Sequence, residues 1–331
     1  MRLIAHNEER FPKKIRAGKS GKQKVRFQYF EDCYKENAFL AEDIRQTVQN
    51  GVPLSEVAVL FRTNMQPRAL MEYMVSANLA FQTKDRIPDI YEHWIARDFF
   101  TYIRIAQGSD SRADFLSIMN RPKRYIGRDS LPDETVCFDE WMKLYEEQPW
   151  IAERIEKLWY DLKHLSRLSP YAAINYIRRG IGYDDYLAEY AEYRNANKED
   201  FYEVADEILA SAKGYRTFEE WFAHIEEYRQ ELKRLAQEKR RNQNAVTFAT
   251  LHSAKGLEFP IVYILDANEG ITPHSRAMLD EDMEEERRLF YVAMTRAKTR
   301  LHVYAVRERY HKKAEVSRFV WEYLGRDGDS R

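Results

Sequence analysis

Strand-like segments lie in two groups, one near each end of the chain, and the long stretch between them contains none. In the first group, VRFQYF (25–30) alternates in polarity and VAVLF (57–61) is a short apolar run. A helical pattern follows each strand, over residues 33–50 and 67–77. Strands that alternate with helices predict a parallel α/β sheet with helices on its faces.

The second group lies near the C-terminus and has the same character. AVTFATL (245–251), IVYILD (261–266) and RLHVYAV (300–306) are strand-like. A helical pattern over 284–297 precedes the last of them, and SRFVWEYL (317–324) predicts a short amphipathic helix. We therefore expect one α/β domain that is split in the sequence and completed after an insertion.

The intervening stretch, from about residue 89 to 240, predicts helices rich in aromatic residues. The helical segments are 98–106, 114–119, 152–165, 170–179, 185–193 and 218–241. We divide the chain into the α/β domain over 25–108 and 244–326, an all-helical insertion over 109–243, and a tail over 327–331. Residues 1–24 form a leader. Its basic part, within 10–26, is either a solvated loop or a phosphate contact.

Composition excludes several classes of protein. Aromatic residues make up 14% of the chain, which excludes disorder, and no apolar stretch is long enough to span a bilayer. The only two cysteines, Cys33 and Cys137, cannot build a disulfide scaffold and fit a reducing cytosol. Lysine and arginine total 53 against 54 aspartate and glutamate, so any nucleic-acid contact must come from local patches.

The sequence offers no phosphate-binding P-loop. Gly18-Lys19-Ser20 resembles the end of one, but Lys13 stands where the first glycine is required and no strand precedes it. The strand 261–266 ends in Asp266 like a Walker B strand, with Glu269 nearby; without a P-loop, we interpret it as a buried strand. The acidic run 280–286 predicts a helix N-terminus rather than a metal site. Within it, Glu284 is spaced to pair with Arg288.

One polar turn and one arginine remain open to more than one interpretation. His252, Lys255, Gly256 and Glu258 follow a strand, where turns face the ligand crevice of an α/β sheet. They suit either a nucleotide or phosphate edge or an ordinary loop surface. Arg296 ends the helix 284–297, where it either complements the helix dipole or serves as an arginine finger toward a γ-phosphate held by another domain.

The order of these segments resembles a known family. TLHSAKGLEFPIVYILDANEGITPH (250–274) and EEERRLFYVAMTRAK (284–298) closely resemble motifs V and VI of UvrD/Rep/PcrA-like superfamily 1A DNA helicases. VAVLFRTNMQPRALMEYM (57–74) resembles the motif IVa stretch, NRPKRYIGRDSL (120–131) a duplex-contacting segment, and SRFVWEYL the terminal helix. The resemblance implies a RecA-like 2A domain interrupted by a helical 2B insertion, with residues 1–24 as a flexible leader after a missing 1A region.

The resemblance also implies roles for individual residues. Arg296 would be the catalytic arginine finger, and Lys255, Gly256 and Glu258 would complete this chain's share of the ATP site, Glu258 near the ribose. Contacts to single-stranded DNA would come from Arg62, Asn64, His252, His274 and, by base stacking, Tyr310. Contacts to duplex DNA would come from Lys123, Arg124 and Gly127. The family usually has Gly-Ile-Gly where this chain has Tyr125-Ile126-Gly127. No metal-ligating residue is expected.

The function so implied is the C-terminal part of a bacterial, cytoplasmic, ATP-dependent 3′–5′ DNA helicase. The full-length enzyme would use ATP and Mg²⁺; this chain alone would bind neither tightly and would not hydrolyse ATP, because the P-loop lysine and the metal carboxylate belong to 1A. Its partners would be single-stranded DNA, a single/double-strand junction and the missing 1A/1B half, with no membrane. Alternatives are a stand-alone non-catalytic DNA-binding or protein-docking module, and the helicase part of a nuclease-fused recombination complex.

Overall fold

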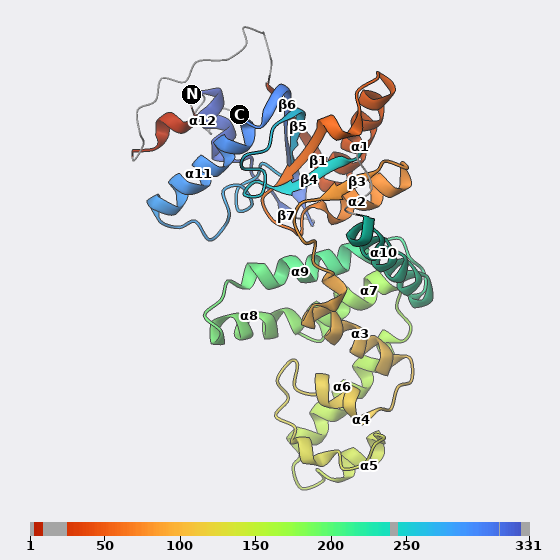
Figure 1. The fold of residues 1–331 in the computed structure, drawn as a ribbon. Helices are drawn as coiled ribbons and strands as arrows, with labels where there is room; N and C mark the ends of the chain where they lie inside the picture. Colours follow the sequence, from red (N-terminus) through yellow and green to blue (C-terminus); the bar gives the residue numbers. More distant parts are fainter. Residues whose placement is uncertain (1–2, 9–24, 239–243, 311, 326–331) are drawn as a thin grey trace. The chain divides into compact units, whose positions relative to one another are not determined.

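The computed structural model describes residues 3–8, 25–238, 244–310 and 312–325. The chain forms two compact units (Figure 1). The first comprises residues 1–88 and 230–331 and is called the sheet unit here. The second comprises residues 89–229 and is called the helical unit. This division agrees with a split α/β domain and a helical insertion.

The sheet unit is built on a sheet whose described strands run in the order β1-β6-β5-β2-β4-β3, with β7 beside β6. All neighbouring pairs are parallel except β6 with β7. The strands are β1 (Val25–Asp32), β2 (Val57–Phe61), β3 (Phe81–Thr83), β4 (Val246–Thr250), β5 (Phe259–Ile264), β6 (Ala297–Arg309) and β7 (Lys312–Lys313). Because β2 lies between β4 and β5, strands from both ends of the sequence alternate across one sheet.

Helices cover both faces of this sheet. Helices α1 (Cys33–Gln49) and α2 (Pro67–Ser76) lie on one face, and α11 (Asp280–Met294) and α12 (Arg318–Leu324) on the other (Figure 1). Strand β2 shows the consequence, since all five of its residues are buried. Val57, Val59 and Phe61 pack in the core that contains α1 and α2 residues, whereas Ala58 and Leu60 pack in the core that contains α11 and α12 residues. Alternate side chains of a strand point to opposite faces, so a continuous apolar run is what a doubly covered strand requires.

The first described residues are packed, in contrast to the predicted flexible leader. Leu3 belongs to a 3₁₀ turn (Leu3–His6) and is fully buried in the core beneath α11. Asn7 donates from Nδ2 to the Glu284 carbonyl at 2.9 Å and accepts from Arg287 at 2.8 Å. These contacts fix residues 3–8 to α11. Residues 9–24, with the rejected P-loop-like segment, lie outside the described residues, as does the predicted tail.

The helical unit contains the helices predicted for the middle of the chain, and four further elements, η3, η4, α5 and α9, were not predicted. Its aromatic core includes Trp141, Tyr183 and Trp221, all almost completely buried. The elements are η3 (Ile90–Glu92), α3 (Trp94–Ala106), α4 (Arg112–Ile118), η4 (Arg128–Ser130), α5 (Phe138–Lys143), α6 (Pro149–Leu165), α7 (Pro170–Asn175), a π-helical turn (Tyr176–Gly180), α8 (Tyr183–Tyr193), α9 (Lys198–Ser211) and the start of α10 (Phe218–Glu238).

The structure moves both predicted boundaries of the insertion, from 108/109 to 88/89 and from 243/244 to 229/230. The first moves because α3 packs against α4, α6 and α9 and therefore belongs to the helical unit. The second moves because Leu232, late in α10, packs against the core of the sheet unit. A change from strands to helices in the sequence marks the insertion, but only packing shows which core each flanking helix joins.

Elements that the sequence did not predict are short or have mixed burial. Strand β3 has three residues and α5 has six, too few for a periodicity to emerge. Helix α9 buries Asp206 and Glu207 along with its apolar residues, which obscures its pattern. A break at 180–182 separates the π-helical turn from α8, and Gly182 adopts a φ of 91° there. None of the described helices combines the length and apolarity needed to cross a membrane.

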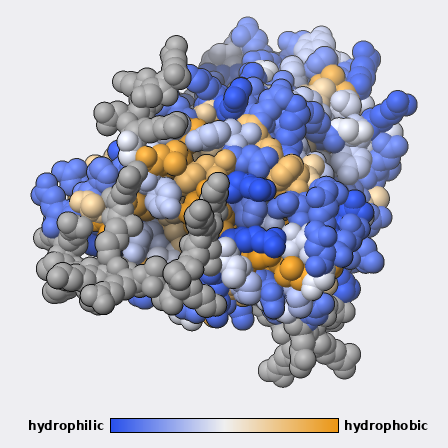
Figure 2. Space-filling model, turned by 90° about the horizontal axis from the view of Figure 1, so that it is seen from above, coloured by the Kyte–Doolittle hydropathy of each residue, from blue (hydrophilic) through white to orange (hydrophobic). Residues whose placement is uncertain are grey.

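The visible surface agrees with the charged composition. Figure 2 shows a face on which hydrophilic residues predominate and apolar residues are scattered among them. Charged residues are thus plentiful on this face, while apolar residues fill the two cores of the sheet unit. This distribution is typical of a water-exposed globular domain.

Candidate nucleotide and DNA interface

The predicted DNA-contacting residues of the sheet unit gather at one edge of the sheet. Arg62 and Asn64 follow β2, His252 follows β4, His274 follows β5, and Tyr310 follows β6. Because these strands are parallel, their carboxyl ends lie at the same edge, which we call the carboxyl edge. Parallel topology thus brings together residues that are up to 248 positions apart, from Arg62 to Tyr310 (310 − 62).

Arg62 is held at this edge by an ion pair that the sequence did not predict. Its guanidinium donates in bidentate fashion to the carboxylate of Glu286 on α11, with a shortest distance of 2.6 Å. The Glu286 carboxylate also accepts from the backbone N–H of His274 at 3.1 Å. Glu286 therefore connects two predicted DNA residues. Glu286 belongs to the acidic run 280–286, but the sequence gave no reason to pair it with Arg62. The pair that was predicted within this run, Glu284 with Arg288, is confirmed at 3.0 Å.

The electrostatics of this pair follow from its partial burial. The side chains of Arg62 and Glu286 are 19% and 10% exposed. Burial alone would raise the pKa of Glu286, but the hydrogen bonds and charge of Arg62 and the His274 N–H outweigh it, so the pKa is lowered from its ordinary value. The carboxylate is therefore ionised at neutral pH. Any phosphate that approaches Arg62 must compete with Glu286 for the guanidinium.

A buried polar network lies behind Asn64. Gln66 accepts from the Thr63 N–H at 2.7 Å and donates to the Asp266 carboxylate at 2.9 Å. Asp266, just beyond β5, has a φ of 45° and is also 3.5 Å from the Arg309 guanidinium. The Asn64 Oδ1 is buried without a hydrogen-bond partner among the described residues. The sequence predicted a buried strand end here, and Asp266 is indeed buried, but its side chain contacts two distant polar residues, Gln66 and Arg309.

The remaining residues of the carboxyl edge differ in their surroundings. His252 is exposed in the turn after β4. Tyr310 has a φ of 49°, and the Arg309 guanidinium lies over its ring at 5.1 Å from the centroid. The ring of Tyr310 is therefore already engaged by a cation on one side. The sequence gave no indication of that contact.

The segment Leu251–Glu258 carries the chain from the carboxyl end of β4 to the amino end of β5. Ala254 anchors it in the core beneath α11 and is fully buried. Gly256 has a φ of 85°, a conformation that residues with a Cβ rarely adopt, and nothing lies within 4 Å of where a Cβ would stand. Lys255 and Glu258 are exposed on either side of it. The segment thus spans the sheet from one edge to the other.

Arg296 lies at the opposite edge of the sheet from Arg62. Its carbonyl accepts from the Phe259 N–H at 2.9 Å, at the amino end of β5. Its guanidinium donates to the carbonyls of Val292 and Leu257, both at 3.0 Å, and to the Thr295 hydroxyl. Because Leu257 lies between Gly256 and Glu258, this bond joins the end of α11 to the segment Leu251–Glu258.

The acidic first turn and the apolar residues of α11 explain how this helix positions Arg296. Asp280, Glu281 and Asp282 occupy its first turn, where carboxylates complement the helix dipole, as predicted. Phe290 and Ala293 face the core and fix the rotation of the helix. Arg296 is then the second residue beyond the helix and lies half-buried. All its hydrogen-bond acceptors in the described part of the chain are carbonyl or hydroxyl oxygens, so no carboxylate neutralises it there.

The four residues predicted for the ATP site are therefore joined by one segment and its contacts. Arg296 bonds to Leu257, and Glu258 pairs with Lys298 at 3.3 Å with both side chains about half exposed. In the described ranges of the chain, this edge thus offers a guanidinium that no carboxylate neutralises, an open glycine turn and a half-exposed carboxylate, groups that can interact with phosphates and hydroxyls. Among the described residues, no cluster of three histidine, cysteine, aspartate or glutamate side chains could hold a metal ion.

The predicted duplex-contacting residues lie in the loop 120–127 of the helical unit. Lys123 is exposed and pairs with Glu189 at 2.9 Å. Arg124 is only 7% exposed, and its guanidinium donates to the carbonyls of Ile118 and Met119 at 3.2 Å. Of the two charged candidates, Lys123 has an exposed side chain, whereas that of Arg124 is buried and bonded to backbone carbonyls. Gly127 has an ordinary φ of −68°.

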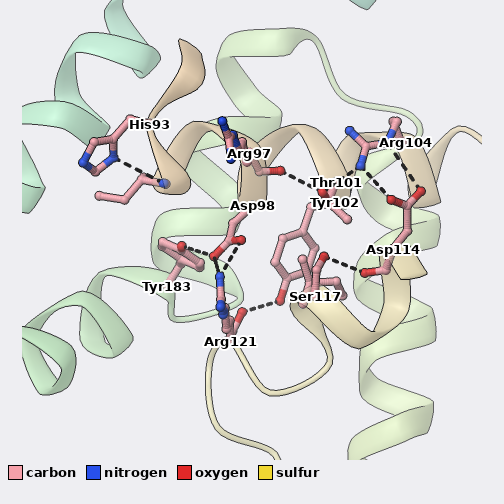
Figure 3. Close-up of polar contacts among 12 residues, drawn as sticks. His93, Arg97, Asp98, Thr101, Tyr102, Arg104, Asp114, Ser117, Arg121 and Tyr183 are labelled. Carbon is pink, nitrogen blue, oxygen red and sulfur yellow. Dashed lines mark hydrogen bonds and ion pairs between the residues drawn. The ribbon is translucent and has the colours of Figure 1, made fainter. Parts of the chain in front are cut away.

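Tyr125 stands where the family usually has its first glycine, and its backbone adopts a conformation that glycine favours. Its φ is 57°, in the left-handed region. Behind the loop, Tyr102 of α3 donates to the Arg121 carbonyl at 2.7 Å, and Asp98 accepts from both Arg121 and Tyr183 (Figure 3). Burial raises the pKa of Asp98, and the bonds from Tyr183 and Arg121 only partly oppose it. The loop is thus held by a buried polar network.

Comparison with known proteins identifies the family. A model of the UvrD-like helicase C-terminal domain matches residues 1–308. The chain is 31% identical over 329 residues to the ATP-dependent DNA helicase PcrA of Staphylococcus epidermidis. It is 27% identical over 336 residues to a Bacillus subtilis protein named "Putative ATP-dependent DNA helicase YjcD". These matches cover 91% and 97% of this chain but 43% of each relative, so the chain spans less than half their length. The chain belongs to the UvrD-like helicase C-terminal domain family.

Proposed function

We propose that this chain supplies the C-terminal half of the motor of an ATP-dependent 3′→5′ DNA translocase and helicase. The observation that carries the proposal is the segment Leu251–Glu258, which links the two edges of the sheet. His252 lies at its start, at the carboxyl edge, and Leu257 at its end accepts from Arg296 at 3.0 Å. A group that binds at one edge can therefore displace residues at the other through one anchored segment.

At the amino edge of β5, we propose that Arg296 acts as an arginine finger. A planar guanidinium that no carboxylate neutralises can stabilise the charge that spreads over the oxygens of a transferring phosphoryl group. Glu258 would accept from the ribose, and Lys255 and Gly256 would form the turn that couples the two edges. ATP with Mg²⁺ would supply the phosphoryl group and its counter-charge, and the cradle for its phosphates would come from a 1A half.

At the carboxyl edge, we propose a track for single-stranded DNA. Arg62 would exchange Glu286 for a phosphate, and Asn64, His252 and His274 would offer polar contacts to the backbone. Tyr310 would stack on a base, which is a contact that tolerates any sequence. In the helical unit, Lys123 and the backbone at Gly127 would meet duplex phosphates, and Arg124 would shape their loop from within. Closure and reopening around ATP would then move the strand along the track.

The purified 331-residue chain tests this proposal. We expect no Mg²⁺-dependent ATP turnover above a blank, with or without single-stranded DNA, because the chain offers the finger without a phosphate cradle. We also expect weak binding to single-stranded DNA that falls steeply as salt rises. Turnover that persists in Arg296→Ala would identify a contaminant. Turnover that Arg296→Ala abolishes would contradict the predicted inactivity, and no DNA binding at low salt would contradict the proposed track.

A further inference from the structure

Tyr125 is an aromatic residue held outward in a conformation that its own side chain disfavours. Its φ of 57° is sterically unfavourable for a residue with a Cβ, and 67% of its surface is exposed. Its neighbours on both sides, Arg124 and Ile126, are buried at 7% and 3% exposure. The loop therefore turns inward before and after Tyr125 and presents the ring to solvent.

The surrounding contacts fix this presentation. The Asn120 side chain accepts from the N–H groups of Arg124 and Ile126 at 3.2 and 3.1 Å and donates to the Ile126 carbonyl at 2.8 Å. It thus bonds the chain on both sides of Tyr125. Tyr102 of α3 holds the same loop, because it donates to the Arg121 carbonyl (Figure 3) and accepts from Arg124 at 3.1 Å. The ring is therefore carried on a rigid support.

A cation and a second aromatic ring extend the exposed surface. Arg154 of α6 lies over the Tyr125 ring at 5.3 Å and over the Trp150 ring at 4.9 Å from their centroids. It also donates to the Arg124 carbonyl at 2.9 Å, which ties α6 to the loop. Trp150 is 49% exposed. We call Tyr125, Arg154 and Trp150 the aromatic platform.

The chemistry of the aromatic platform favours a nucleobase over an apolar partner. Two rings and a guanidinium present flat surfaces that stack on any base. Lys123 in the loop and Arg128 directly after it are exposed and add positive charge, although Glu189 partly compensates Lys123. A buried role for Tyr125 is excluded by its exposure. The left-handed conformation of Tyr125 is therefore not explained by burial of its ring, whose cationic neighbour is Arg154.

We propose that Tyr125 stacks on the base exposed at the end of a DNA duplex, where single and double strands meet, with Arg154 and Trp150 supporting the ring. This inference rests on the proposed function, because it assumes that the loop 120–127 approaches duplex DNA. It adds a base contact to a segment otherwise expected to meet only phosphate. Phosphate contacts position a duplex, whereas a stacked ring caps its last base pair.

The test uses the 331-residue chain and a DNA hairpin with a 3′ single-stranded tail. A 2-aminopurine replaces the adenine of the terminal base pair at the junction, and a dye on the tail reports affinity by anisotropy. Tyr125→Gly removes the ring and gives the position a residue that accepts positive φ without strain. Tyr125→Phe keeps the stacking surface. Tyr193→Ala is the matched control, since Tyr193 is an 83% exposed tyrosine of the same unit.

We expect binding to change 2-aminopurine emission for the wild type, Tyr125→Phe and Tyr193→Ala. Tyr125→Gly should lose that change and bind the junction on the order of tenfold more weakly, with an unaltered salt dependence. Its melting temperature should be equal or higher. Wild-type affinity and emission in Tyr125→Gly would overturn the inference alone and leave a protein partner as the occupant of the aromatic platform. Failure of the wild type to bind the hairpin at low salt would overturn both the inference and the proposed DNA-binding role.

Discussion

The Arg296 guanidinium donates to two backbone carbonyls and a hydroxyl, all of which are neutral acceptors. Arg62, in contrast, faces the Glu286 carboxylate. The two arginines were predicted from similar sequence signals, yet one keeps a net positive charge in the described structure and the other is paired. An unpaired guanidinium is suited to a ligand whose charge increases during a reaction, because it need not first break an ion pair.

The role of Arg296 can be tested in a helicase that contains the ATP-cradling half. Arg296→Ala should lower kcat by about a thousandfold or more, as loss of an arginine finger does, with DNA affinity changed by less than about threefold. Arg288→Ala is the matched control, because Arg288 is a cation on the same helix that pairs with Glu284 and Glu285. Steady-state ATP hydrolysis and DNA titration measure the two effects. Equal losses in both would contradict the assigned role, and a melting curve would detect any loosening of the Leu257 contact.

At the scale of elements, buried polar groups join the ends of strands and helices at the carboxyl edge. Glu36 of α1 is 1% exposed and accepts from the Asp266 N–H at 3.3 Å. Burial and then the Asp266 charge raise the pKa of Glu36 well above its ordinary value, and the Asp266 N–H and Arg309 oppose this only in part. These contacts tie α1 to the end of β5, behind the loop that carries Arg62 and Asn64.

Glu36 should make stability depend on pH. Above the ordinary pKa of glutamate, the unfolded chain releases this proton while the folded chain retains it, so the free energy of unfolding falls as pH rises toward the raised pKa. Glu36→Gln cannot titrate and keeps an acceptor for the Asp266 N–H. We expect Glu36→Gln to raise the free energy of unfolding at pH 8, by about 1.4 kcal/mol for each pH unit over which the folded chain alone retains the proton. The dependence of the unfolding free energy on pH should become flatter. Urea unfolding between pH 5 and 8 measures this.

Glu42→Gln on the same helix provides the control for Glu36→Gln. Hydrogen bonds from Arg45 and then Gln46 lower the pKa of the exposed Glu42 to about 2. Its contribution therefore has the opposite sign and is lost only as pH falls toward that value. Solvent screening keeps it small. Parallel pH profiles for the wild type and Glu36→Gln would show that Glu36 is not held protonated in the fold.

At the scale of the whole molecule, the helical unit is an insertion whose ends meet. Arg229, its last residue, donates to Asp89, its first residue, at 2.8 Å. The rings of Tyr91 and Tyr228 pack edge to face beside this pair, with centroids 6.0 Å apart. A segment with joined ends and its own core can leave and re-enter a host domain without disturbing it.

Residues 89–229 should therefore fold as a separate polypeptide. We expect a helical circular dichroism spectrum and one cooperative thermal transition, because the buried aromatic core lies within these residues. Asp89→Ala should lower the midpoint by a few degrees, consistent with loss of about 1 kcal/mol from a partly buried ion pair. Glu189→Ala removes an exposed partner of Lys123 and should change the midpoint less. A spectrum without a cooperative transition would show that the unit depends on its host.

The sequence by itself determined the parallel α/β architecture, the helical insertion and the helix that precedes Arg296, because alternation, helical periodicity and acidic capping are local properties. It also determined which residues follow each of the predicted strands. Only the tertiary structure decided that Glu286 neutralises Arg62, that Arg124 is buried, that Leu3 is packed, and that α3 belongs to the insertion. Those outcomes depend on contacts between residues far apart in the chain, and a short-range pattern carries no information about which distant charge or core a side chain will meet.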